Sequence, residues 1–380
     1  MPKEIKSVRE VSGLKGKKVI LRSDLNVPIK NERVENDFRI RKSLETIKFL
    51  QEAGARVILI AHIHLPESRS LKPVFDVLKK NLNLVMSPEV LGPETDWLAG
   101  EMKDGDILLL ENLRLDEREE KNDINFANSL SELGDIYVND AFSVSHRKHA
   151  SIVGLPTLLP SYSGLLFEEE IRRVSRVLDP PRPFLFILGG AKFDTKIPLI
   201  IKYLDKADFV YAAGALANDF FKLQGYEIGI SMTSGMDFNL ENYIKRENLY
   251  LPKDVTVRND KGIFVKRPNE VLSTDHVLDI GTESIAELKN LISKSEFILW
   301  NGPLGDYEKG FRDGTIDLAR AIIESPAQSV VGGGDTFAVI SKLGLEKDFD
   351  FISTAGGALL FYLYDGTLPG IEALIPSQSS

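Results

Sequence analysis

Short runs of hydrophobic residues alternate along most of the chain with longer stretches in which hydrophobic residues recur every three or four positions. The short runs, rich in Val, Ile, Leu and Phe, predict β-strands: Val19–Arg22, Val57–Ile60, Ile107–Leu110, Ile136–Val138, Phe184–Leu188, Phe209–Ala212, Phe297–Trp300, Ser329–Val331 and Phe351–Ser353. The stretches between them predict amphipathic helices, the clearest being Ile40–Glu52, Phe126–Leu133, Ile197–Leu204, Ile285–Ile292 and Thr315–Ile323. Strands that are apolar without alternation are buried on both faces, as in parallel sheets flanked by helices. The pattern therefore predicts an α/β protein.

Two such series follow one another, separated by the proline-rich segment 178–183. Proline disfavours helix at its own position and at the residue before it, so this segment ends the helical stretch Glu168–Leu178. The stretch has one apolar stripe, and we interpret it as a helix that connects two doubly wound domains; the alternative is a core helix of the second domain. The predicted boundaries are 1–160 for the first lobe, 161–180 for the connecting helix and 181–365 for the second lobe.

The composition agrees with two globular domains. The chain has 380 residues, and at roughly 150 residues per domain the expected number is two. Its formal net charge of −9 argues against nucleic-acid binding, which needs a basic face. The excess of acid is uneven, since residues 1–160 hold 24 of the 47 basic residues but only 25 of the 56 acidic ones. The first lobe therefore has room for a local anion site.

The chain contains no cysteine, which excludes disulfides, thiolate metal sites and thiol nucleophiles. The first six residues are charged and lack the apolar run of a signal peptide. No apolar run approaches the roughly 18 residues that a membrane span needs. We therefore expect a cytoplasmic protein with no membrane or nucleic-acid partner.

The first lobe is predicted to gather polar side chains at one edge of its sheet. Ligands of open α/β sheets bind beyond the carboxyl ends of the strands. The loops after the first four strands and the start of the first helix contain cations, histidines and a short polar pair: Asp24, Asn26, Arg39, His62, His64, Arg114, His146, Arg147 and His149. Guanidinium groups bind carboxylate and phosphate in a bidentate manner, so this set predicts a site for a small polyanion.

The histidines allow a second interpretation. His62 and His64 form a His-x-His after a strand, a spacing that can hold a metal ion. A metal site of that kind needs more histidines and an aspartate after later strands, and only His276 remains in the second half. A third possibility is that His64 and His149 are solvated loop residues.

The second half has glycine-rich turns after its strands. Gly189-Gly190 follows one strand and leads into a helix that carries Lys192 and Lys196 on one face. Three further glycine-rich segments also follow predicted strands: 301–305, 332–336 and 354–358. Glycine lets backbone N–H groups approach phosphate oxygens, and a helix N-terminus favours anions. With an Asp-Thr pair able to hold Mg²⁺, these turns predict a nucleotide phosphate site. The sequence has neither the P-loop nor the Gly-x-Gly-x-x-Gly motif.

Motifs in the same order resemble those of the phosphoglycerate kinase family over nearly the whole chain. They are Arg22–Pro28, Asp37–Ile40, Glu111–Arg114, Val138–Phe142, His146–Ser151, Leu188–Lys192, Trp300–Pro303, Gly332–Thr336 and Leu368–Gly370. The resemblance implies two Rossmann-like lobes with parallel sheets, joined by a helix and hinge, with a C-terminal tail of about 366–380 packing on the first lobe. It also implies reversible phosphoryl transfer between 1,3-bisphosphoglycerate and ADP, with Mg²⁺ and with ATP/ADP as co-substrate. We expect a monomer.

The resemblance further implies a role for each matching residue. Those similar to the family's phosphoglycerate ligands are Asp24, Asn26, Arg39, His62, Arg114 and Arg147. Those similar to its nucleotide ligands are Gly190, Lys192, Lys196, Asn301, Glu308, Gly333, Gly334, Asp335 and Thr336. Arg39 and Lys196 resemble the catalytic cations, and Asp335 resembles the metal ligand. Phosphoryl transfer needs mostly positioning and charge compensation, which these groups supply.

Several positions depart from the family's pattern. Leu65 stands where the family has a substrate-binding arginine, and the other departures are Ala213, Ala215, Asp306, Ala355 and Leu359. They leave open an alternative, a catalytically impaired protein that binds nucleotide or a phosphorylated metabolite. The presence of Arg39, Lys196, Glu308 and Asp335 favours the active enzyme.

Overall fold

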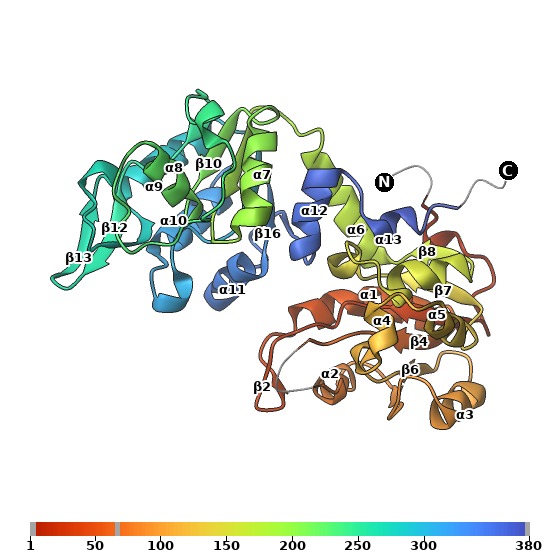
Figure 1. Ribbon diagram of the computed structural model, residues 1–380. Coiled ribbons are helices and arrows are strands. Elements are labelled where there is room, and N and C mark those ends of the chain that lie inside the picture. Colours follow the sequence, from red (N-terminus) through yellow and green to blue (C-terminus); the bar gives the residue numbers. More distant parts are fainter. Residues whose placement is uncertain (1–4, 65–68, 377–380) are drawn as a thin grey trace. The chain divides into compact units, whose positions relative to one another are not determined.

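The computed structural model describes residues 5–64 and 69–376 (Figure 1). Leu65, one of the departures from the family's pattern, lies outside the described residues. The chain divides into two compact units, one formed by Met1–Arg172 with Thr367–Ser380 and the other by Arg173–Gly366. Among the described residues, no helix combines the length and the hydropathy that a membrane crossing requires.

The first unit is built on a six-stranded parallel sheet. The strands are β1 (Lys18–Arg22), β4 (Arg56–Ile60), β5 (Val85–Met86), β6 (Ile107–Leu109), β7 (Ile136–Asn139) and β8 (Ser161–Ser163). Their order is β5-β6-β4-β1-β7-β8, and every pair is parallel. The chain leaves β1 toward β4 on one side and later returns to β7 on the other. The carboxyl ends of β1 and β7 therefore flank the point where the winding reverses, the usual ligand position in such sheets.

Helices cover this sheet. They are α1 (Phe38–Glu52), α2 (Lys72–Leu78), α3 (Pro93–Glu101), α4 (Glu117–Glu120), α5 (Ile124–Ser131) and α6 (Leu165–Val174). Helix α1 shows the principle, because Ile40, Ile47 and Leu50 recur on one face and lie in the same buried core as the strands. A two-stranded hairpin, β2 (Ile29–Lys30) with β3 (Arg33–Val34), precedes α1.

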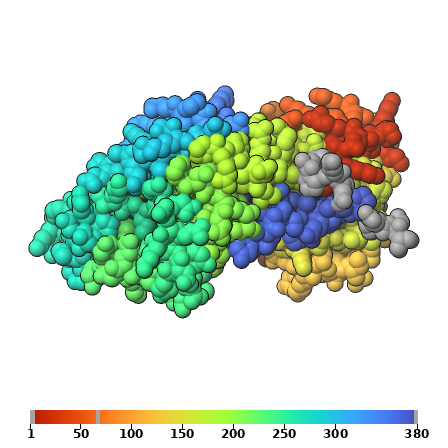
Figure 2. All heavy atoms as spheres, turned by 90° about the horizontal axis from the view of Figure 1, so that it is seen from above, coloured from red at the N-terminus to blue at the C-terminus, as the bar shows by residue number. Residues whose placement is uncertain are grey.

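The segment 367–376 packs on the rest of the first unit. Helix α13 (Pro369–Glu372) lies beside the π-helical turn Ala150–Gly154, and the Gly370 N–H donates to the Ser145 carbonyl at 2.8 Å. A Cβ on Gly370 would lie 2.7 Å from that of Ser145, so only glycine fits this contact. In Figure 2 this part of the chain, in blue, lies beside the yellow residues of the first unit.

The second unit is built on another six-stranded parallel sheet. Its strands are β9 (Phe184–Leu188), β10 (Phe209–Ala212), β11 (Leu249–Tyr250), β15 (Phe297–Asn301), β16 (Gln328–Gly332) and β17 (Phe351–Ile352). The order β11-β10-β9-β15-β16-β17 is that of dinucleotide-binding Rossmann sheets, and the winding reverses between β9 and β15. The rings of Phe184 and Phe297 meet edge to face across these two strands, with centroids 5.6 Å apart.

Helices surround this sheet in two groups. They are α7 (Phe193–Tyr203), α8 (Leu216–Leu223), α9 (Thr282–Ser293), α10 (Asp313–Ile323), α11 (Gly334–Leu343) and α12 (Gly357–Asp365). Helix α7 packs against α8 and α12, whereas α10 packs against α9 and α11. The predicted fold class is confirmed, since both units are parallel sheets with helical crossovers and all of the predicted strands are present.

A small antiparallel sheet in the second unit was not predicted. It has the order β13-β12-β14 and consists of β12 (Val255–Asn259), β13 (Gly262–Lys266) and β14 (His276–Ile280). Val255 and Val257 alternate with more exposed residues and pack with Phe221 of α8. The alternation and the glycine at position 262 are a hairpin signal that the sequence did contain. In the structure Gly262 has a φ of +136°.

Candidate active site

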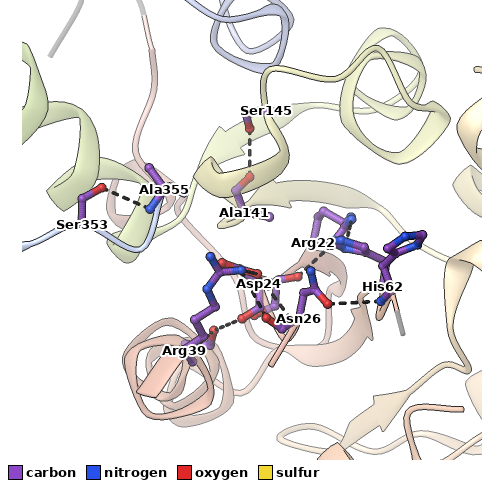
Figure 3. Close-up of polar contacts among 12 residues, drawn as sticks. Arg22, Asp24, Asn26, Arg39, His62, Ala141, Ser145, Ser353 and Ala355 are labelled. Atoms are coloured by element: carbon purple, nitrogen blue, oxygen red, sulfur yellow. Dashed lines mark hydrogen bonds and ion pairs between the residues drawn. The ribbon is translucent and has the colours of Figure 1, made fainter. Parts of the chain in front are cut away.

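The loop after β1 and the start of α1 form the first part of the site (Figure 3). Asp24 is buried, and its Oδ1 accepts a hydrogen bond from Arg39 Nη1 at 3.3 Å. The same nitrogen donates to the Asn26 carbonyl at 3.2 Å. Within the described residues, Asp24 Oδ2 is buried without a hydrogen-bond partner. These contacts orient Arg39, whose side chain is 25% exposed, at the end of the sheet.

His62 follows β4 and is buried beside Arg22 of β1. Arg22 Nη2 lies 3.0 Å from His62 Nδ1 (Figure 3). Burial lowers the pKa of His62 well below its usual value, and the positive charges of Arg22, Arg114, Arg147 and Arg39 lower it further. His62 is therefore neutral, and it lies within the field of every arginine that the sequence assigned to this site.

Arg114 and Arg147 complete the cationic group. Arg114 lies in the 3₁₀ turn Leu113–Leu115, is 9% exposed, and has its Nε 3.1 Å from Glu120 Oε1. Burial lowers the pKa of the Arg114 guanidinium, and Glu120 opposes that effect. Arg147 is exposed, and its charge depresses the pKa of both His62 and Arg114.

The remaining histidines differ from one another. His64 is exposed, as the solvated interpretation expects, and its backbone N–H donates to Asn26 Oδ1 at 3.2 Å. His149 is buried, so that interpretation is wrong for it. Burial lowers the pKa of His146 and His149 to about 4. In residues 5–64 and 69–376, no three His, Asp or Glu side chains lie close enough to hold a metal ion, which argues against the His-x-His metal site.

In the second unit, the loops after β9 and β15 approach at backbone distance. A Cβ on Gly189 would lie 2.1 Å from the Pro303 carbonyl oxygen, and one on Gly302 would lie 2.2 Å from the Gly189 carbonyl oxygen. Neither position can hold a larger residue without moving the main chain. Gly190, at φ +84°, carries the chain from this contact toward α7.

Lys196 of α7 is buried under these loops. Its Nζ donates to the Gly189 carbonyl at 2.6 Å and to the Asn301 carbonyl at 3.4 Å. Burial lowers the pKa of Lys196 to about 7, the neighbouring Lys192 contributes in the same direction, and Asp335 opposes them. Lys192 is the exposed N-cap residue of α7, so the two lysines share a helical turn but differ in burial.

The start of α11 provides backbone N–H groups and a helix N-terminus. Gly333 has φ +101° at the N-cap, and the Thr336 hydroxyl accepts a hydrogen bond from the Gly302 N–H at 2.8 Å. Asn301 Nδ2 is buried, has no hydrogen-bond partner within the described residues, and lies 3.3 Å from where a Gly333 Cβ would be. An unused donor beside a helix N-terminus is suited to a phosphate oxygen.

A cavity of about 870 Å³ extends from this helix start. Of the predicted nucleotide residues, Gly190, Glu308 and Asp335 line it. Its wall also contains residues that were not predicted to belong to a nucleotide site: Phe221, Met232, Pro252, His276, Leu278, Tyr307 and Lys342. Several of these belong to α8 and β14, and their position depends on the antiparallel sheet that was not predicted.

Departures from the family's pattern are accommodated locally. Ala215 and Asp306 line the cavity, and the Asp306 carboxylate pairs with Lys309 at 2.7 Å and caps the turn Tyr307–Lys309. Ala213 is fully buried, and so is Leu359, whose side chain occupies the space beside Gly332. Ala355 is buried, with its N–H bonded to the Ser353 hydroxyl at 3.1 Å.

The titration of Lys196 predicts a pH-dependent stability. Below pH 7 the folded protein buries an ammonium group, whereas between about pH 7 and 10 the unfolded chain binds a proton that the folded state has released. The contribution of Lys196 to stability therefore rises with pH across this window. Lys196→Met should be more stable than the parent protein at pH 6.5, and the difference should shrink by pH 9.5. Urea unfolding at both pH values measures it, and a difference independent of pH would contradict the assignment.

Known proteins match the chain over nearly its whole length. A family model described as phosphoglycerate kinase matches residues 8–365. The phosphoglycerate kinase of Orientia tsutsugamushi (strain Ikeda) is 41% identical over 386 residues, covering 95% of this chain and 95% of that protein. That of Coprothermobacter proteolyticus is 40% identical over 390 residues, covering 98% and 99%. The solved phosphoglycerate kinases of Coxiella burnetii and Pyrococcus horikoshii OT3 match with TM-scores of 0.82 and 0.86 and identities of 35% and 30%, each covering 97% of this chain and 98% of the other.

Proposed function

The chain belongs to the phosphoglycerate kinase family, and from that premise we propose which of its residues carry the reaction. The protein is a phosphotransferase with a carboxyl group as acceptor, and it exchanges a phosphoryl group between 1,3-bisphosphoglycerate and ADP. No finding favours the alternative of an impaired kinase, and the departures in the second unit fit their surroundings.

We propose that the first unit binds phosphoglycerate. The observation that carries this proposal is a buried His62, 3.0 Å from Arg22, which lies in the field of Arg39, Arg114 and Arg147. Such a set offers several N–H donors and a positive potential to a ligand with a carboxylate and a phosphate. Asp24 and the Asn26 carbonyl would orient Arg39. Asp24 would accept a hydrogen bond from the substrate hydroxyl, and the Asn26 side-chain amide would donate to the substrate carboxylate.

We propose that the second unit binds ATP or ADP. Glu308 and the cavity wall would hold the nucleoside, while Asn301, Lys192 and the N–H groups of Gly333, Gly334 and Thr336 would hold the phosphates. The buried Lys196 would follow the phosphoryl group during transfer. Because the transferred group carries negative charge on its equatorial oxygens, a preorganised cation near it lowers the barrier.

The residues around the start of α11 fit a magnesium ion. Mg²⁺ in kinases is usually held by one or two carboxylates and by the nucleotide phosphates, so a cluster of three acidic residues is not needed. Asp335 is an exposed carboxylate in the first turn of α11 and lines the cavity. We propose that it holds Mg²⁺, which would supply charge neutralisation for the phosphates when bound.

Asp335→Asn should raise the Mg²⁺ concentration needed for half-maximal activity by about tenfold or more, because a neutral amide is a weaker ligand than a carboxylate. Velocity measured against Mg²⁺ at saturating ATP tests this. Asp348→Asn, which alters an exposed acid after α11, is the matched control. An unchanged Mg²⁺ requirement in Asp335→Asn would remove this residue from the metal site.

The proposed assignment is tested by a coupled assay of ATP formation from 1,3-bisphosphoglycerate and ADP. We expect turnover that requires both substrates and Mg²⁺. Saturable binding of both ligands without turnover would instead support the impaired kinase.

We also propose that the two units close on each other during catalysis. The proposed substrate residues belong to the first unit and the proposed nucleotide residues to the second, and the reacting oxygens must come to about 3 Å. The radius of gyration, measured by small-angle scattering, should fall when 3-phosphoglycerate and ATP are bound together. An unchanged radius at saturation would count against closure.

We propose further that the protein acts as a cytoplasmic monomer, since the reaction uses only small metabolites. Light scattering after size exclusion tests the monomer, and a stable dimer would overturn it.

A further inference from the structure

A buried polar chain lies behind His62 and links four elements of the first unit. Arg22 of β1 donates from Nε to the Ser151 hydroxyl at 2.9 Å, and the same hydroxyl lies 2.6 Å from Glu119 Oε1. Ser151 belongs to the π-helical turn Ala150–Gly154 and Glu119 to α4. Tyr137 of β7 donates its hydroxyl to the Ser151 carbonyl at 2.6 Å. All four side chains are fully or almost fully buried.

The direction of each hydrogen bond follows from the donors available. Arg22 has only N–H donors, so the Ser151 oxygen must accept from it and its own hydrogen must point to Glu119. The Ser151 backbone N–H also donates to Glu119, at 2.9 Å to Oε2. Burial raises the pKa of Glu119, and the charge of Arg22 together with the two bonds from Ser151 acts in the opposite direction. In this series of hydrogen bonds, Glu119 is therefore the final acceptor and Arg22 is the donor.

The contact with Arg22 determines the tautomer of His62. Arg22 Nη2 contacts His62 Nδ1 at 3.0 Å, and since the guanidinium can only donate, Nδ1 must accept. The ring hydrogen is then on Nε2, and a proton on Nδ1 would face an N–H group. The charged groups that act on His62 from the other elements are Arg39, Arg114 and Arg147, all of them positive.

We propose that Arg22 is a positioning residue which, held by Ser151 and Glu119, keeps His62 in the tautomer that presents an N–H at Nε2 to the anionic substrate. This inference rests on the proposed role of His62 as a phosphoglycerate ligand. The burial of Arg22 and Glu119 is weak evidence for a role in stability, because well-packed apolar residues often do as well. The hydrogen bonds that connect Glu119 and Ser151 to Arg22, and Arg22 to the His62 imidazole, suggest that these buried charges orient a ligand-binding side chain.

Ser151→Ala is the most direct test, because it removes the link while changing one oxygen. In the parent protein, ¹⁵N spectra of the histidine rings should show His62 with its hydrogen on Nε2 from pH 5 to pH 8. In Ser151→Ala, a second tautomer or a titration of His62 should appear, and KM for 3-phosphoglycerate should rise about three- to thirtyfold. The value of kcat and KM for ATP should change less than about twofold. Glu119→Gln should act in the same direction.

A double-variant cycle separates positioning from a general structural role. If Ser151 acts through His62, then adding Ser151→Ala to His62→Gln should raise KM no further. Ser87→Ala is the matched control, since Ser87 is an equally buried serine that bonds Thr95 at 2.6 Å elsewhere in the unit. It should leave both the His62 spectrum and KM unchanged. Arg22→Met removes the residue that joins Ser151 to His62. If this variant does not fold, Ser151→Ala provides the test.

Two outcomes would overturn the inference. The first is that Ser151→Ala leaves both the His62 ring spectrum and KM for 3-phosphoglycerate unchanged. The second is that the rises in KM caused by Ser151→Ala and His62→Gln multiply when the two changes are combined. Failure of the proposed function looks different. If His62→Gln leaves KM for 3-phosphoglycerate unchanged, His62 is not a substrate ligand, whereas the ring spectra still report whether Arg22 sets its tautomer.

Discussion

Replacing Lys196 with methionine should lower kcat by roughly 10²–10³ and change KM for the nucleotide little, because one preorganised charge donor contributes on that scale. The Lys196 ammonium is held by the carbonyls of Gly189 and Asn301, at the place where β9 and β15 meet. The role that we propose for it places this ammonium next to the transferred phosphoryl group. Its contacts with that group should therefore strengthen in the transition state more than in the ground state.

Steady-state kinetics in both directions would measure this, with Lys192→Met as the matched control. Lys192 is exposed at the N-cap of the same helix, so its loss should mainly raise KM for the nucleotide. The stability of Lys196→Met should not fall, because the variant removes a buried ammonium. A variant that kept kcat and only raised KM would show that Lys196 binds the ground state alone.

The second large effect is expected for Arg39→Ala, which should also lower kcat by roughly 10²–10³. Asp24 and the Asn26 carbonyl hold the Arg39 guanidinium at 3.3 Å and 3.2 Å, so its orientation is set before the substrate binds. Such a group can compensate charge on the reacting acyl phosphate without first reorganising.

The matched control for this variant is Arg41→Ala, two residues further along the same helix. Arg41 is exposed and pairs with Asp37 at 2.9 Å, so its removal should leave kcat within about twofold. Arg39→Ala is therefore distinguished from a general loss of charge on α1. If Arg39→Ala raised KM for phosphoglycerate but kept kcat, its role would be binding only.

Nine of the twelve parallel strands could be located from the sequence because their signal is local, whereas the short edge strands β5, β8 and β11 were not predicted. A strand buried on both faces needs an uninterrupted apolar run, and Phe184–Leu188 is one. The small antiparallel sheet was not predicted because its strands are half exposed. In Gly262–Lys266 the exposed residues Ile263, Phe264 and Val265 look like a buried run, although they lie on an edge strand.

The polar residues divide in a similar way. Residue type and position after a strand pointed to Arg39, Lys196 and the glycines, since phosphate chemistry needs cations and close backbone approach. Arg22 was passed over although it ends a predicted strand, because nothing local distinguishes a buried arginine from an exposed one. The sequence also could not predict that Lys192 is exposed whereas Lys196, four residues later, is buried.

The sequence by itself determined the fold class, the positions of most parallel strands along the chain and the residue types at their carboxyl ends. All of these depend on a few neighbouring positions. The tertiary structure alone decided the state of the side chains. Arg22 meets Ser151 across 129 positions, and Lys196 meets Asn301 across 105. The burial, charge state and hydrogen-bond direction of a polar group depend on such distant partners, because its desolvation and its partners come from elements that only the folded sheet brings together.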